Sequence, residues 1–148
     1  MSKVKENEIN LKFIEDFKKN MEGKLEPSVI DDAVEKLFFW ENKKYPAIGI
    51  VESFIFYIRF DIIINTDKKH FQGNAGGLTT PGIGSVFGNV HTDDLVKLYS
   101  DTVSFAFHAT AITFNVLFFN SYSQTLGYFS GGAISIVSGI GGGTGSWS

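Results

Sequence analysis

The sequence of 148 residues contains no cysteine. Disulfides, thiol catalysis and cysteine-based zinc sites are therefore excluded, although this absence leaves the redox compartment open. No stretch reaches the roughly 18 consecutive apolar residues that a membrane-spanning helix requires. Any contact with a membrane would thus be made from outside or by a barrel.

Charge is scarce in the second half of the chain. Of 13 basic and 16 acidic side chains, residues 75–148 carry only Asp93, Asp94, Lys97 and Asp101. The formal net charge of −3 and the pI near 5.5 offer no cationic surface to phosphate backbones. We therefore predict that nucleic acid is not a partner. The charged start, residues 1–8, predicts that this sequence has no secretory signal peptide.

The chain is rich enough in apolar side chains to fold. Its hydrophobic fraction is 43%, and Phe occurs 15 times, which is too hydrophobic for a disordered chain. The length predicts one domain. We predict a flexible or helical arm over residues 1–26 and a folded domain over residues 27–148, in a monomer.

Two helices are predicted before residue 45. Apolar residues spaced by four, at Ile9, Phe13, Phe17 and Met21, indicate an amphipathic helix that Gly23 could end. A second helix is expected near Pro27 and Ser28, with Asp31 and Asp32 near its positive end. Its expected buried stripe, which we assign to packing and not to a membrane surface, is Val29, Ala33, Val34 and Leu37.

From Ser53 the apolar period changes to two, which predicts a half-buried strand. Turn residues follow at 65–69, a returning strand at 70–80, a turn at Pro81, a strand at 83–91 and a short helix. Thr92 or Asp93 would cap this helix. The apolar face of the first strand is Phe54, Phe56, Ile58, Phe60, Ile62 and Ile64, and the helix would pack through Leu95, Leu98 and Tyr99.

The second half repeats this plan. Alternating Phe residues at 105–107 and 114–118, a polar turn at 120–124 and a Gly-rich strand at 126–138 follow one another as in the first half. Short strands separated by turn signals indicate a sandwich or a closed barrel of two similar four-strand units. Closure would also hide the sheet edges.

The Gly-rich end, GIGGGTGSWS at residues 139–148, is similar in composition to a phosphate-binding loop. A Walker loop needs a lysine and a following helix, and the dinucleotide pattern needs a glycine where Thr144 stands. We therefore interpret these glycines as the bends of a terminal strand, with Trp147 as an aromatic stopper.

No catalytic or metal-binding constellation is evident. His70, His91 and His108 are widely separated and differently flanked, so we predict no metal and no cofactor. His108 is expected to face solvent from a strand. Neither a nucleophile elbow nor a convincing carboxylate pair is present, since Glu52 and Asp61 are expected to point outward on a solvated surface.

Several stretches of the second half together resemble the virulence-associated protein (Vap) family of intracellular actinobacterial pathogens of the Rhodococcus type. Weaker similarity extends the resemblance from about residue 28 to the end. The segments that carry it are 76–82 (GGLTTPG), 85–88 (SVFG), 99–107 (YSDTVSFAF), 126–135 (LGYFSGGAIS) and the Gly-rich end with Trp147.

The resemblance implies a compact eight-stranded antiparallel barrel of two Greek-key halves, with a helix and a variable N-terminal arm. It further implies a packed interior, no enzymatic activity, and export to the host's phagocytic vacuole. The charged start departs from the family's N-terminal leader. Either the leader has been removed, which keeps the secreted location that the resemblance implies, or the location is cytoplasmic. No catalytic or binding residue can be transferred, because the family pattern includes no such motif.

Three functions are compatible with these observations. The first is a non-enzymatic effector that acts through surface contacts with host membranes or a host protein, aided by loss of net negative charge as the vacuole acidifies. The second is a lipocalin-like barrel that binds a small apolar ligand inside. The third is an enzyme built around His91, Asp93 and Asp94, for which a capped helix entry is the simpler interpretation.

Overall fold

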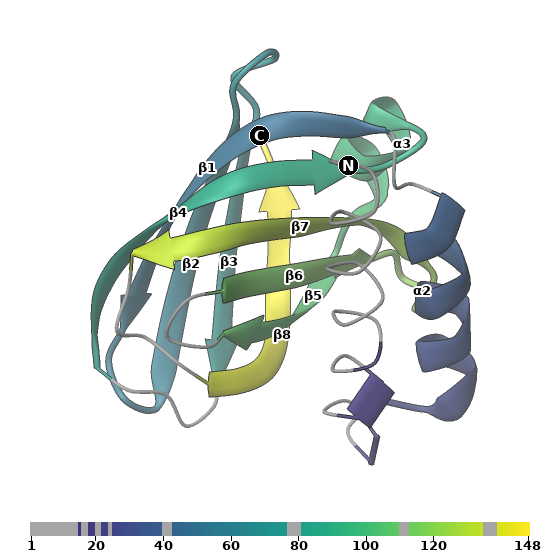
Figure 1. Cartoon of the computed structure of the whole chain (residues 1–148), viewed down its shortest axis with the longest axis horizontal. Coiled ribbons are helices and arrows are strands. Elements are labelled where there is room, and N and C mark those ends of the chain that lie inside the picture. Colours follow the sequence, from purple (N-terminus) through teal and green to yellow (C-terminus); the bar gives the residue numbers. More distant parts are fainter. Residues whose placement is uncertain are drawn as a thin grey trace, which may run out of the picture.

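The computed structural model describes residues 15, 18–19, 22–23, 25–39, 43–76, 81–109, 113–134 and 139–148. Over these residues the chain forms an antiparallel barrel with one helix on its side and a shorter helix at one end (Figure 1). In chain order the elements are α2 (Pro27–Phe39), β1 (Lys44–Ser53), β2 (Tyr57–Ile64), β3 (His70–Gly76), β4 (Gly82–His91), α3 (Leu95–Asp101), β5 (Ser104–Ala109), β6 (Thr113–Phe119), β7 (Thr125–Ile134) and β8 (Gly139–Trp147).

The strands close in the order β1-β2-β3-β8-β5-β6-β7-β4, and every neighbouring pair is antiparallel. Each half is a Greek key, because the fourth strand of each unit returns beside the first, as β4 beside β1 and β8 beside β5. The predicted eight-stranded barrel of two such halves is confirmed. Closure leaves each strand paired on both sides, which removes the unpaired backbone of an open sheet edge.

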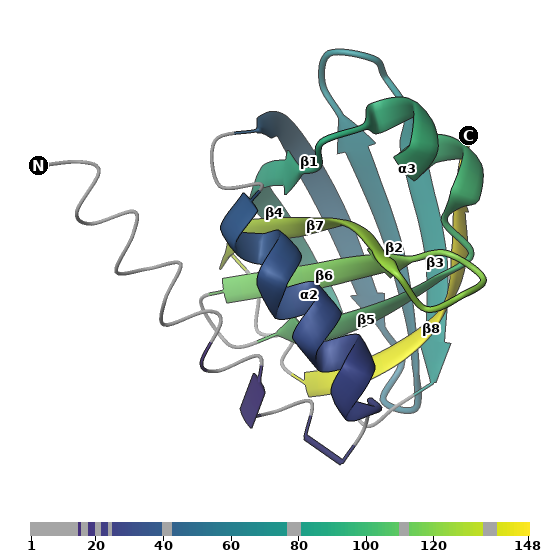
Figure 2. The same cartoon turned by 90° about the vertical axis from the view of Figure 1, so that its right-hand side faces the viewer.

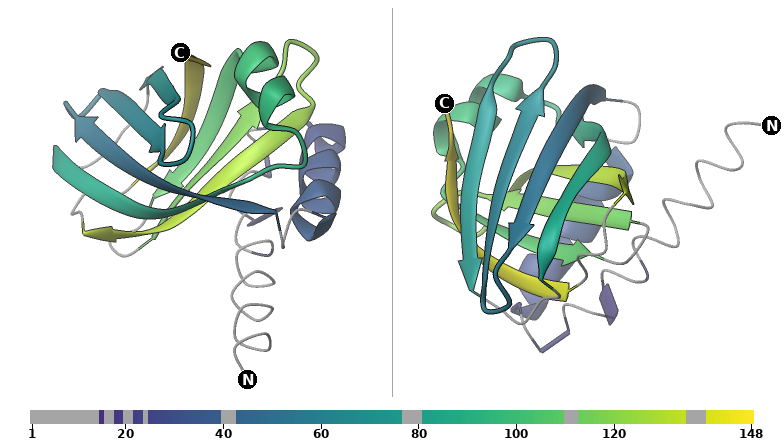
Figure 3. Two further views of the ribbon diagram at one scale, coloured as in Figure 1. Left: turned by 90° about the horizontal axis from the view of Figure 1, so that it is seen from above. Right: turned by 90° about the vertical axis from the view of Figure 1, so that its left-hand side faces the viewer.

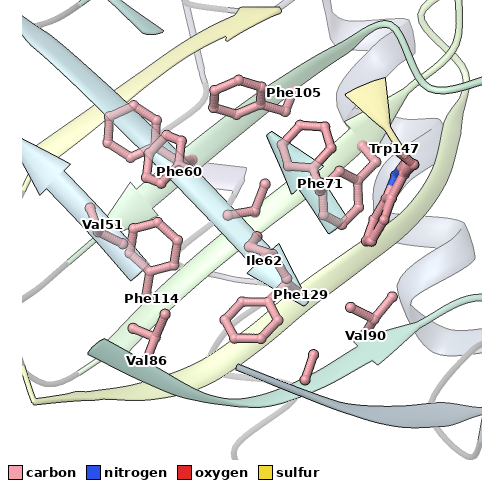
Figure 4. Packing of buried hydrophobic residues seen from close by; sticks show 14 of the residues in the cluster. Val51, Phe60, Ile62, Phe71, Val86, Val90, Phe105, Phe114, Phe129 and Trp147 are labelled. Atoms are coloured by element: carbon pink, nitrogen blue, oxygen red, sulfur yellow. The ribbon is translucent and has the colours of Figure 1, made fainter. Parts of the chain in front are cut away.

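Aromatic rings fill the interior of the barrel. Phe60 makes ring contacts with Phe105 and Phe107, each at 5.1 Å between centroids (Figure 4). Phe71 reaches Phe118 at 4.9 Å across the barrel. Edge-to-face pairs of this kind add to the stabilisation that apolar burial provides. The structure places the predicted apolar faces of the strands inside the barrel. They are Ile58, Phe60, Ile62 and Ile64 of β2, and Phe105, Phe107, Phe114, Val116 and Phe118 of β5 and β6.

The Gly-rich end forms β8, as predicted. A Cβ on Gly145 would lie 2.5 Å from the Phe71 ring, and a Cβ on Gly141 would lie 3.0 Å from the Phe107 ring. The glycines of this strand thus leave space for phenylalanine rings. Trp147 ends the strand inside the core, with its ring 5.3 Å from those of Tyr99 and Phe118.

Helix α2 covers the outer face of the second unit (Figure 2). Pro27 is its first residue, as predicted, and Ala33 is fully buried within the stripe. Ile30, which the prediction omitted, is also buried, and Asp31 and Asp32 lie beyond the first turn. Beneath the helix lie four buried side chains of the barrel wall, Ala106, Leu117, Phe119 and Tyr128.

Helix α3 covers one end of the barrel near Trp147. Its N-cap is Asp94, whose Oδ1 accepts from the Lys97 amide at 3.0 Å, and not Thr92 or Asp93 as predicted. The Thr92 hydroxyl donates instead to the Leu126 carbonyl at 2.7 Å. Packing of the helix through Leu95, Leu98 and Tyr99 is confirmed.

Two predictions for the first half are wrong. The first strand, β1, begins at Lys44 and ends at Ser53, where the first strand is predicted to begin. Alternation does not reveal β1, because apolar residues occupy both of its faces. Phe54 and Phe56 are exposed on the turn between β1 and β2 and not in the core, because that turn interrupts the inward phase. The predicted first helix, with Ile9, Phe13, Phe17 and Met21, lies outside the described residues.

Candidate docking surface

The structure shows the surroundings of His91, Asp93 and Asp94, the residues of the enzymatic hypothesis. The buried His91 ring stacks on Tyr128, with 4.4 Å between centroids and 5° between planes. Asp94 caps α3, and Asp93 is exposed beside it. Within the ranges described above, no group of three or more His, Asp or Glu side chains could hold a metal ion, and no helix is long and apolar enough to cross a bilayer.

The remaining titratable candidates lie on the outer wall. His70 Nδ1 lies 3.2 Å from Asp61 Oδ1, and the half-buried His108 has the outward phase of its strand. Glu52 is in register with Arg59, whereas the register partner of Asp61 is Ile50. Glu52, Arg59 and Asp61 line one shallow pocket of about 210 Å³ on the outer wall of β1, β2 and β3, whereas His108 lies apart from them on β5.

The pKa of Tyr99, on α3, departs clearly from its ordinary value. Burial, together with donation of its hydroxyl to Asp67 Oδ2 at 2.8 Å, raises the pKa of Tyr99 well above 10. The Lys69 ammonium lies 5.7 Å from the ring centroid. This cluster secures the β2–β3 turn against α3.

Exposed apolar side chains are the main feature of one part of the outer wall. This apolar surface has two parts, which we call the hairpin tip (Phe54, Ile55 and Phe56) and the side strip (Ile48, Ile50, Ile83 and Phe87). The side strip spans β1 and β4, where Ile48 is in register with Phe87 and Ile83 with Glu52. The most exposed members are Ile83 at 75% and Phe56 at 74%. Exposed apolar patches rather than scattered residues mark sites of interaction.

The hairpin tip has a strained backbone. The Phe54 amide donates to the Tyr57 carbonyl at 2.8 Å, so Ile55 and Phe56 form a two-residue turn. Ile55 has φ of 80°, a region that is sterically poor for a β-branched residue. The Tyr57 hydroxyl donates to Asn74 Oδ1 at 2.6 Å, and its ring lies 6.2 Å from that of Phe54.

The end of the barrel that bears the hairpin tip is almost without charge. At this end β1 leads into β2, β3 into β4, β5 into β6 and β7 into β8, as the register of the strand ends shows. The described residues at this end, 53–57, 75–76, 81–84, 108–109, 113–115, 131–134 and 139–142, contain no Asp, Glu, Lys or Arg.

The opposite end carries most of the barrel's charge. There lie the β2–β3 turn, helix α3 and the starts of β1 and β5 (Figure 1). Apart from Glu52, Arg59 and Asp61, the charged side chains of residues 43–148 belong to these segments. They are Lys43, Lys44, Asp67, Lys68, Lys69, Asp93, Asp94, Lys97 and Asp101.

A groove of about 620 Å³ lies beside the start of α2. In the right-hand view of Figure 3, α2 lies behind the barrel and strands β1 and β4 lie in front. The walls of the groove mix apolar and hydroxyl groups over the bare backbone of Gly141 and Gly142, and Glu26 is its one charged lining residue among those described.

The fold and this surface define a class: closed antiparallel barrels of two Greek-key units, with an aromatic interior and one apolar end. The chain belongs to the family described as Rhodococcus equi virulence-associated protein, which it matches over residues 3–148. The family is known for its association with virulence and not for a catalysed reaction, which supports a virulence-related role for this chain.

Two solved structures of this family, both from the intracellular pathogen Rhodococcus equi, are similar to the chain. Virulence-associated protein VapD has 47% identity and a TM-score of 0.70, over 72% of this chain and 97% of VapD. Virulence-associated protein VapB has 43% identity and a TM-score of 0.67, over 72% of this chain and 96% of VapB. Among curated proteins, none matches the chain.

The sequence did not reveal the apolar surface. Phe54 and Phe56 continue the alternation of β2, so the sequence predicts that they share its apolar face. The available signal was the run of residues 47–51, in which apolar side chains occupy both strand phases. Such a run indicates a strand with two apolar faces, of which the barrel can bury only one.

Proposed function

We propose that the protein is a non-enzymatic, virulence-associated barrel that is secreted and docks onto host membranes. The observation that carries this proposal is the exposed surface formed by the hairpin tip and the side strip. Burying apolar area against a bilayer gains roughly 25 cal/mol per Å², so seven exposed apolar side chains on one wall provide a substantial driving force.

The setting proposed for this activity is an acidifying host vacuole. The chain carries a formal net charge of −3 at pH 7, and its pI is near 5.5. As the pH falls toward the pI, repulsion between the protein and anionic lipids decreases. Docking onto anionic membranes is therefore expected to strengthen with acidification.

Site-specific labelling tests the proposal, since the absence of cysteine makes a single introduced thiol unique. An environment-sensitive dye is placed at Phe56→Cys on the hairpin tip. The control is Tyr122→Cys, on the turn before β7, where the native side chain is 83% exposed. With liposomes, the emission of the dye at position 56 should shift to the blue, and that at position 122 should not.

The labels also distinguish the proposed partner from a host protein. No shift at either position with any liposome, together with no co-sedimentation of the unlabelled chain, would contradict membrane docking. Equal shifts at both positions would contradict the assigned surface. A shift at position 56 produced only by host-cell protein, and not by lipid, would replace the membrane with a protein partner.

A further inference from the structure

The charges beside the apolar surface are few. Glu52 and Arg59 are cross-strand neighbours in the register of β1 and β2, so opposite signs stand together. Asp61 has His70 within 3.2 Å. The other charged side chains of the barrel lie at the opposite end of the strands. The apolar surface therefore presents no cationic cluster to attract an anionic headgroup.

We infer that the apolar surface fits an electrically neutral, zwitterionic bilayer, and that the hairpin tip enters the bilayer by apolar burial and not by charge attraction. This inference rests on the proposed function and specifies its lipid class. Because the whole chain is net negative at pH 7, anionic headgroups weaken the attachment at that pH.

The shape of the hairpin tip is suited to entry. Phe54, Ile55 and Phe56 stand consecutively on the turn, so the leading part of the hairpin is wholly apolar. Tyr57 follows directly, with its hydroxyl held by Asn74 at 2.6 Å. Tyrosine has an apolar ring and a polar end, and it is enriched at the headgroup level of membranes for that reason. Along the hairpin, the side chains thus change from apolar ones that suit the bilayer interior to a tyrosine that suits the headgroup level.

The side strip extends this contact along the wall. Ile83 is in register with Glu52 near the tip, and Ile48 with Phe87 lies farther up the same strands. A barrel that tilts toward this wall buries the tip first and the strip next. Surface-bound proteins of this kind gain affinity with the apolar area that they bury.

A bilayer suits this surface better than a protein partner does. The strands beneath it are paired on both sides, so no backbone is offered for strand addition. Protein interfaces combine an apolar centre with a polar rim that makes several hydrogen bonds. Among the described polar residues beside this surface are Glu52 and Arg59, which are register partners, the exposed Ser85, and Tyr57, whose hydroxyl already has an acceptor.

The test measures binding of the full chain to vesicles at about pH 7. One set is pure phosphatidylcholine, and the other contains phosphatidylglycerol. Each is measured at about 0.1 M and about 1 M NaCl, between which the Debye length falls from roughly 10 Å to 3 Å. We expect binding to the neutral vesicles to change less than about twofold with salt, and binding to the anionic vesicles at low salt to be weaker.

Matched variants locate the contact. Phe56→Ser and Ile83→Ser should each weaken binding about tenfold or more. Tyr122→Ser and Val96→Ser remove side chains of similar exposure, 83% and 76%, from the charged end and should leave binding unchanged. All four residues are exposed, and circular dichroism melting of each variant verifies its fold.

The outcomes separate this inference from the proposed function. Binding only to anionic vesicles, abolished by salt, would overturn the inference and leave membrane docking in place. Binding to no vesicle would overturn the proposed function itself. In the absence of lipid, sedimentation velocity should show a monomer. A dimer that Ile83→Ser abolishes would assign the surface to a second copy and overturn the inference.

Discussion

Gly143 of β8 lies directly opposite Ala75 of β3 in the register of the two strands that join the halves of the barrel. A Cβ on Gly143 would overlap the carbonyl oxygen of Asn74 and come within 2.7 Å of the Ala75 Cα. Both obstacles are backbone atoms, which cannot rotate away. The glycine is therefore required by the close approach of the two strands.

Gly143→Ala should accordingly destabilise the barrel by at least about 1–3 kcal/mol, the cost typical of overpacking. Chemical denaturation of the variant measures this loss. The control is Gly76→Ala in β3, where a Cβ has no neighbour within 4 Å and the effect should stay within about 0.5 kcal/mol. Equal stability of the two variants would contradict the close strand approach.

Ile55→Asn should stabilise the protein while weakening its attachment to vesicles. At φ of 80°, Ile55 occupies a conformation that asparagine tolerates far better. Relief of about 1 kcal/mol would raise the melting temperature by roughly 2–4 °C in a chain of this size. Calorimetry should find no such rise for Phe56→Asn, which removes an exposed apolar residue without a positive φ. A lower melting temperature for Ile55→Asn would show that the turn is not strained.

Asp32 is expected to hold α2 against the barrel. Its Oδ2 accepts from the Thr125 amide at 3.0 Å, and Lys36 Nζ donates to the Thr125 carbonyl at 2.9 Å. Asp32→Ala leaves the Thr125 amide unpaired, at a cost of about 1–3 kcal/mol. Asp32→Asn retains an acceptor oxygen and should cost less. Hydrogen exchange of α2 amides should accelerate in the alanine variant and remain unchanged in Asp31→Ala, whose side chain is exposed.

Tyr99 should make the barrel sensitive to alkali. The folded chain holds the pKa of Tyr99 above its ordinary value of 10, chiefly through burial and secondly through Asp67. Above about pH 10 the unfolded chain therefore releases this proton before the folded chain does, so the free energy of unfolding falls as the pH rises. The contribution is fully present below about pH 10.

Melting temperatures at about pH 8 and about pH 11 measure this effect. The decrease between them should be smaller in Tyr99→Phe than in the unmodified chain, although the variant loses the hydrogen bond to Asp67. Tyr122→Phe, at a fully hydrated position, serves as the control. An equal decrease in all three proteins would remove Tyr99 as the source of the alkaline sensitivity.

The strands whose inward residues were predicted correctly share one property. In β2 the inward Ile58 and Phe60 alternate with the polar or charged Tyr57, Arg59 and Asp61, so the period of two is visible in the letters. In β1 the outward residues include the apolar Ile48 and Ile50, so its two faces do not differ in polarity and alternation does not predict the strand. The tip was misassigned for a related reason, since alternation continues through Phe54 and Phe56 although the chain turns there.

The sequence by itself determined the class of the fold, the phase of most strands and the structural nature of the Gly-rich end, because these depend on local pattern and on missing residue types. Only the tertiary structure decided which outward apolar residues are covered. Ala106, Leu117 and Phe119 lie beneath α2, whereas Ile48, Ile50 and Phe87 have no such cover among the described elements. Both sets are outward apolar positions on strands, and their exposure depends on where a distant helix packs, which local periodicity does not encode.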